Sequence, residues 1–246
     1  MLVLLCFLCV AVVEAGVCGT IGEVKAQPQG TLVCVTGSVT YIEPTECYIE
    51  SADRSAGIWV QADTSGIVLA DLVSASGTLG IANGERVIQS ATLSLAGVGP
   101  AIAPLGVRNN WLGGFYQAGT AALQDFVAYR IPDDGTGRRW QAAAGASTIG
   151  LLATTWGRVN AVYYSPITNA HWFYIDDGSG VVSDCGDLGV IVYSGADVHQ
   201  GDCVTVTGVS SIEVSFDDAT RLVRSIRPRS GGDVRFTGAG QQEAAR

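Results

Sequence analysis

Residues 71–77 read "DLVSASG" and residues 202–208 read "DCVTVTG", so Asp, Val and Gly recur at the same spacing. In the first stretch Val73 and Ala75 face one way and their neighbours face the other, which is typical of a β-strand with one buried side. Upstream, the order of matching residues is also kept: Gly37-x-Val39 matches Gly157-x-Val159, and Tyr48-Ile49-Glu50 matches Tyr174-Ile175-Asp176. A pattern that recurs in one order, with variable loops between, indicates two copies of one folding unit.

The length of 246 residues accommodates two units of roughly 100 residues and a connector. The 32 glycines and the small number of lysines favour many short strands and tight turns over long helices. We therefore expect an all-β protein. Its predicted parts are an apolar leader (1–16), a first barrel (17–105), a connector (106–148), a second barrel (149–236) and a polar tail (237–246).

The connector has no copy in either repeat and contains six aromatic residues, among them Trp111 and Trp140. Disordered linkers are poor in aromatics, and long loops inside compact proteins tend to be functional or to cover a surface. The sequence therefore predicts an ordered segment packed between or against the two units.

The leader is an uncharged apolar run from Leu2 to Val13. It is shorter than the ~20 residues that span a bilayer, but it has the length of a signal-peptide core, with a small-residue cleavage site before Gly16. No Lys or Arg precedes the run, so the alternative is a segment retained in the mature chain. We expect export to the cell surface or the extracellular medium, with cleavage favoured.

Seven cysteines fit an exported chain. Cys185 and Cys203 belong to the same repeat, and we predict that they form a disulfide. Neither a zinc spacing nor a calcium loop is present, since the chain has two histidines and its "DDGSG" turn lacks the alternating oxygens and terminal Glu that calcium needs. We expect no metal and no cofactor.

The repeated features are a Gly in the first strand, "YIDDGSG" after the second and "GDCVTVTG" in the fourth. In this combination the chain resembles the OB-fold, a five-stranded Greek-key barrel, and in particular tandem OB-fold proteins exported by bacteria. The resemblance implies two tandem OB-like five-stranded barrels. It implies no activity, because OB-folds host many functions.

The aromatic residues Tyr48, Trp172 and Tyr174 alternate with apolar residues that the repeat marks as core, so we expect their rings to face outward. That strand surface of an OB-fold takes bases or sugars. These three residues are the candidate ligand or partner surface. The alternative is that the connector or a neighbouring subunit covers the rings.

The net charge of −9 weighs against nucleic acid as a partner, because neutralising phosphates needs clustered Lys and Arg. Arg227 and Arg229 alternate with Ile226 and Pro228, and we interpret them as a solvated strand face, with contact to an anionic partner as the alternative. No nucleophile–base motif or phosphate loop is present, so we predict that the chain is not an enzyme.

The main hypothesis is a non-catalytic secreted or cell-surface structural protein that assembles with itself, with glycan as a possible partner. The alternative is an OB-fold binding module for oligosaccharide or single-stranded nucleic acid.

Overall fold

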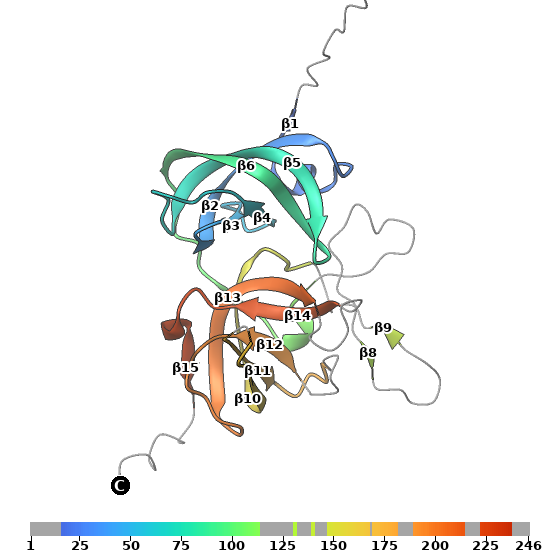
Figure 1. Ribbon diagram of the computed structural model, residues 1–246, viewed down its shortest axis with the longest axis vertical. Helices are drawn as coiled ribbons and strands as arrows, with labels where there is room; N and C mark the ends of the chain where they lie inside the picture. The colour runs from blue at the N-terminus through green and yellow to red at the C-terminus, as the bar shows by residue number, and fades with distance from the viewer. Residues whose placement is uncertain are drawn as a thin grey trace, which may run out of the picture.

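The computed structural model describes residues 16–113, 130–131, 139–140, 147–167, 169–181, 189–214 and 222–237. Strands dominate these residues, and they form two separate barrels that Figure 1 shows one above the other. No helix in these residues is long and apolar enough to cross a membrane.

The first barrel has five main strands, and two short elements add to it. The strands are β2 (Leu32–Glu43), β3 (Glu46–Glu50), β4 (Gly57–Gln61), β5 (Asp71–Ala82) and β6 (Glu85–Val98). The strand order is β2-β3-β4-β6-β5, and β5 pairs back with β2, which closes the barrel. The short β1 (Val17–Cys18) adds to β2 in parallel, and the helix α1 (Ile21–Lys25) follows it.

The second barrel repeats this order. Its strands are β10 (Leu152–Ser165), β11 (Ala170–Asp176), β12 (Val190–Tyr193), β13 (Cys203–Val214) and β14 (Leu222–Arg227). They run β10-β11-β12-β14-β13, and β13 pairs back with β10. One parallel pair among antiparallel ones, β4–β6 in the first barrel and β12–β14 in the second, occupies the same place in both. The predicted fold of two tandem OB-like barrels is confirmed.

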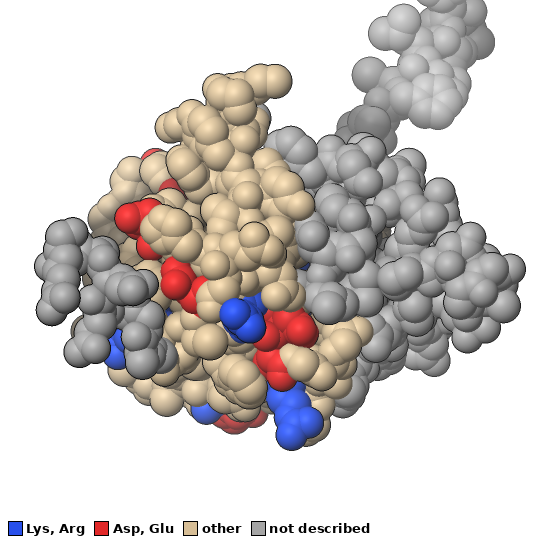
Figure 2. Space-filling model, turned by 90° about the horizontal axis from the view of Figure 1, so that it is seen from below, with Lys and Arg blue, Asp and Glu red and all other residues tan. Residues whose placement is uncertain are grey.

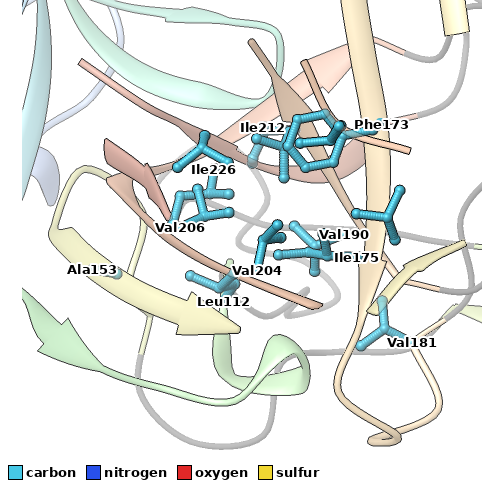
Figure 3. Close-up of a cluster of buried hydrophobic side chains, with 14 of the residues drawn as sticks. Leu112, Ala153, Phe173, Ile175, Val181, Val190, Val204, Val206, Ile212 and Ile226 are labelled. Atoms are coloured by element: carbon cyan, nitrogen blue, oxygen red, sulfur yellow. The ribbon is translucent and has the colours of Figure 1, made fainter. Parts of the chain in front are cut away.

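Each barrel has its own core of alternating strand residues. Figure 3 shows the second core, where Phe173 and Ile175 of β11 point toward Val206, Ile212 and Ile226. The helix α1 packs against the first core, and its Ile21 and Val24 are buried there. A capping box between Thr20 and Glu23 fixes the start of that helix.

The repeated first-strand glycines have a steric cause. A Cβ atom at Gly157 would lie 2.8 Å from the backbone of Asp176, and one at Gly37 would lie 3.1 Å from the carbonyl oxygen of Glu50. Shortly after each glycine the first strand has a bulge, and there it bends across the second strand. The Gly therefore marks where the barrel closes on itself.

The end of the first unit differs from the predicted boundary at residue 105. The strand β7 (Leu105–Gly106) pairs with β10, and the 3₁₀ turn η1 (Asn109–Trp111) is followed by Leu112, which is buried in the second core. The first residues of the connector thus pack on the second barrel. Beyond residue 113 the structure describes only the paired strands β8 (Arg130–Ile131) and β9 (Arg139–Trp140) before residue 147. The predicted ordered wrap otherwise lies outside the described residues.

The disulfide arrangement differs from the prediction. Cys203 carries a free, exposed thiol at the start of β13, while Cys185 lies outside the described residues. A disulfide links Cys18 of β1 to Cys34 of β2 instead. These two cysteines are brought together by the parallel pairing of their strands, in which they are direct partners. The predicted pair was chosen because Cys185 and Cys203 belong to the same repeat. The parallel pairing of β1 with β2 was not foreseen.

Candidate functional site

The outward face of the first barrel contains three packed rings. Tyr48 of β3 stacks on Trp59 of β4, with ring centroids 6.3 Å apart, and meets Tyr41 of β2 edge-on at 5.9 Å. Tyr48 is 0% exposed. The three rings form one apolar cluster with Leu152 and Val209 of the second barrel. We call this set the aromatic face of the first barrel, and the second barrel covers it.

A buried carboxylate connects this face to the second barrel. Glu85 of β6 accepts a hydrogen bond of 3.0 Å from the Tyr48 hydroxyl, and it also accepts from the Ser211 hydroxyl and the Ile212 N–H of β13. Burial, reinforced by the neighbouring Glu85, raises the pKa of Tyr48 well above its ordinary value. The hydroxyl therefore stays a donor, as the carboxylate requires.

Arg227 of β14 makes the second polar connection. It donates to Glu46 of β3 at 3.0 Å and to Glu213 of β13 at 2.8 Å, and its guanidinium lies 5.8 Å from the centroid of the Trp59 ring. The interpretation of Arg227 and Arg229 as a solvated strand face is wrong for Arg227, whose side chain is 15% exposed. Strand alternation does place it outward, but the outward face of β14 meets the first barrel.

The equivalent rings of the second barrel are buried as well. Trp172 and Tyr174 of β11 are 7% and 1% exposed, and they pack with Ile191 and Val223. Tyr163 of β10 stacks on Trp172 at 5.7 Å and meets Tyr174 edge-on at 5.8 Å. The three predicted surface residues therefore do face outward from their barrels, but in this arrangement Tyr48, Trp172 and Tyr174 offer almost no ring surface to a ligand.

An accessible site lies elsewhere on the second barrel, around Trp156 of β10. This ring is 55% exposed. With Arg108 and the turn residues Asp177, Gly178 and Ser179 it lines an open pocket of about 250 Å³. The pocket thus combines one exposed aromatic ring, one guanidinium and a polar turn, a set that suits stacking together with hydrogen bonding.

The turn side of the pocket is held by the connector's first residues. Asp177 accepts hydrogen bonds of 2.9 Å from the backbone N–H groups of Asn109 and Ser179. The side-chain amide of Asn109 in turn donates to Thr155 and to the carbonyl oxygen of Trp156. Two N–H donors therefore offset part of the charge of Asp177, and the loop is fixed before any ligand arrives.

Two further arginines flank Trp156 on the same outward face. Arg158 is exposed and lies two residues along β10, about 7 Å away by strand geometry. Arg235 of β15 (Val234–Phe236) is exposed and pairs with Thr205, which pairs with Trp156. That places Arg235 two strands from the ring, about 10 Å away. We call Trp156, Arg108, Arg158 and Arg235 the Trp156 surface.

Sequence reasoning missed this surface although a signal was present. Trp156 and Arg158 flank the repeated Gly157 and alternate with buried residues, so both could have been assigned to the outside of the barrel. Arg108 could not have been placed, because it reaches the pocket only through the pairing of β7 with β10. No group of three or more His, Cys, Asp or Glu side chains placed to hold a metal occurs in the described residues.

No family model and no curated protein matches the chain. Solved structures with weak likeness include fission yeast Pot1 with single-stranded DNA, at 9% identity and a TM-score of 0.35 over 91% of this chain and 89% of that one. A murine DNA-binding protein bound to double-stranded DNA has 9% identity and a TM-score of 0.31, over 83% and 97%. The Ifi202 HINa domain with double-stranded DNA has 14% identity and a TM-score of 0.30, over 86% and 97%. Likenesses this weak assign no function, and the fold rests on the strand order above.

These structures nevertheless require one correction. The prediction that nucleic acid is an unlikely partner is contradicted by the three structures named above, which contain single- or double-stranded DNA. The physical weakness of the prediction is that net charge sums the whole surface, while a ligand meets a local part of it. Figure 2 shows basic and acidic side chains interspersed on the face it displays.

Proposed function

We propose that the protein is a non-catalytic binding module that holds single-stranded nucleic acid on the Trp156 surface. The observation that carries the proposal is the half-exposed Trp156 ring beside Arg108 in an open pocket. Proteins that bind single strands combine aromatic stacking of bases with cationic contacts to the backbone. Trp156 would stack a base, and the three arginines around it would contact phosphates.

The test is fluorescence anisotropy with a labelled oligothymidine of about 15 nucleotides at low salt. Stacking on one ring contributes roughly 1–3 kcal/mol, so Trp156→Ala is expected to weaken binding about 5- to 150-fold. Arg108→Gln and Arg158→Gln each weaken binding and lower the salt slope by roughly 0.7. Tyr164→Ala is the matched control, because this exposed ring lies on the same strand, about 27 Å away.

The result against the proposal is an oligonucleotide affinity that Trp156→Ala and Tyr164→Ala change equally, or no binding at low salt. Oligosaccharide is the second candidate, since Asp177 and Ser179 in the pocket can hydrogen-bond sugar hydroxyls beside a stacking ring. Binding of a soluble glycan that Trp156→Ala abolishes, without any oligonucleotide binding, would assign the pocket to sugars.

We further propose that the protein works outside the cytosol. The Cys18–Cys34 disulfide supports this, because such bonds persist in oxidising compartments. Peptide mapping of the native protein without reduction is expected to find these two cysteines linked. If export includes cleavage of the leader, N-terminal sequencing is expected to begin at Gly16.

A further inference from the structure

The contact between the barrels contains a carboxyl group that is only half satisfied. Glu50, at the end of β3, is 0% exposed. Its Oε2 accepts a hydrogen bond of 2.7 Å from the Leu152 N–H at the start of β10, so this residue links the first barrel to the second. Its Oε1 accepts no hydrogen bond in the described residues, and the nearest cation, the Nε of Arg54, is 3.8 Å from it.

The charged groups around Glu50 come from two elements of the first barrel. Arg54 lies in the turn that follows β3 and is the ion-pair partner. Lys25, at the end of α1, donates to the carbonyl oxygens of Gly57 and Ile149, and Gly57 is the strand partner of Glu50. Among the described residues of the second barrel, the uncharged Leu152 N–H is the group that contacts Glu50. Oε1 therefore faces little that would stabilise a full negative charge.

The geometry agrees with the electrostatics. Burial raises the pKa of Glu50 to about 7, against the opposing effects of the Leu152 N–H and Arg54. Burial also raises the pKa of Glu213 on the other side of the contact, although Arg227 opposes the shift. Both groups would be exposed if the barrels separated, and their pKa values would then return toward the ordinary value for Glu.

We propose that the contact between the barrels is a pH-sensitive clasp, in which the second barrel covers the aromatic face of the first while Glu50 carries a proton and releases that face as Glu50 ionises. The covered face, Tyr41, Tyr48 and Trp59, occupies the position that OB-folds use for ligands. The clasp does not depend on what binds at the Trp156 surface.

Proton linkage determines whether the closed state gains or loses stability as the pH rises. The closed state keeps its proton up to about pH 7, whereas the open state loses it near the ordinary Glu value of about 4.3. Between these two values the closed state binds more protons, so its stability falls as the pH rises and is constant above pH 7. From pH 5 to pH 8 the ratio of closed to open protein is expected to fall roughly 50- to 100-fold.

Amide hydrogen exchange of the full chain, followed by NMR, measures this ratio. The Leu152 and Ile212 N–H groups both donate across the contact, to Glu50 and Glu85, and report on its opening. The Val159 N–H donates to Asp202 within the second barrel and reports on unfolding of that barrel. Between pH 5 and pH 8 the protection factors of Leu152 and Ile212 are expected to fall about 50- to 100-fold. The protection factor of Val159 is expected to show no such fall.

Three variants sharpen the experiment. Glu50→Gln keeps an acceptor for Leu152 but cannot ionise, so both reporters stay protected at pH 8. Arg54→Asn removes the cation that lowers the pKa of Glu50, so the fall in protection is expected at higher pH. Asn is chosen because it tolerates the left-handed backbone of that residue (φ 61°). Asp63→Asn, a change at an exposed carboxylate of the same barrel, leaves the fall as in the wild type.

Equal protection of Leu152 and Ile212 at both pH values would overturn the clasp. So would an equal fall of Val159, since the barrels would then unfold rather than separate. A fall that persists unchanged in Glu50→Gln would assign the pH dependence to another group and also reject the proposal.

Discussion

The two barrels share one strand order but use the same surface differently. Tyr48 and Tyr174 occupy equivalent places in the second strands of their barrels. Each lies directly opposite an outward-facing residue of the third strand. In the first barrel that partner is Trp59, and the cluster meets the second barrel; in the second barrel it is Ile191, and the cluster packs with its own barrel's residues. What this surface contacts therefore depends on residues that differ between the two repeats.

The fifth strands show the same contrast. Arg86 and Arg224 are equivalent, and both are buried at the inner side of their strands. The residue before each differs: Glu85 joins the two barrels through two hydrogen bonds from β13, while Val223 is part of an apolar cluster. Repeated residues therefore build the barrel, and the unmatched polar residue specifies which barrel covers the other.

The largest expected loss of stability comes from removing the Glu85 carboxylate. Glu85→Ala leaves the Tyr48 hydroxyl, the Ser211 hydroxyl and the Ile212 N–H without their acceptor inside a buried contact. Breaking a buried charged network in this way costs about 3–5 kcal/mol. Urea unfolding is expected to show this loss. A loss below about 1 kcal/mol, which is common for an exposed carboxylate, would mean that water replaces the carboxylate and that the contact is open.

The fold was predictable because its signals are local and occur twice. Gly157 and Gly37, the alternating valines and the "DLVSASG" pattern each describe a barrel strand without reference to anything outside the barrel. Whether an outward ring is accessible is a different question, because it depends on what packs against it. The sequence predicted that Tyr48 faces outward, but no local pattern indicates that Val209, more than 150 residues later, covers it.

A second prediction compares the barrels at their repeated glycines. A Cβ at Gly157 would press against backbone atoms of Asp176 at 2.8 Å, whereas at Gly37 the nearest atoms are at 3.1–3.2 Å and include the movable side chain of Ile21. Overpacking costs about 1–3 kcal/mol. Gly157→Ala is therefore expected to lose about 2 kcal/mol and Gly37→Ala about 1 kcal/mol. Equal losses in urea unfolding would show that the two crossings are equally tight.

The smallest effect is expected at Trp156, and it separates binding from folding. Trp172→Ala removes a buried ring that stacks on Tyr163, and such truncations cost about 3–5 kcal/mol. Trp156→Ala removes a ring that is more than half exposed, so the free energy of unfolding changes by about 0.5 kcal/mol or less.

Thermal and urea unfolding of both variants test this difference. Because Trp156→Ala leaves the barrel intact, any loss of ligand affinity in that variant reports on the surface itself. A large loss of stability in Trp156→Ala would instead mean that the ring supports the turn at Asp177 and Ser179. The pocket would then be a structural feature of the second barrel, and the proposed binding surface would lose its main support.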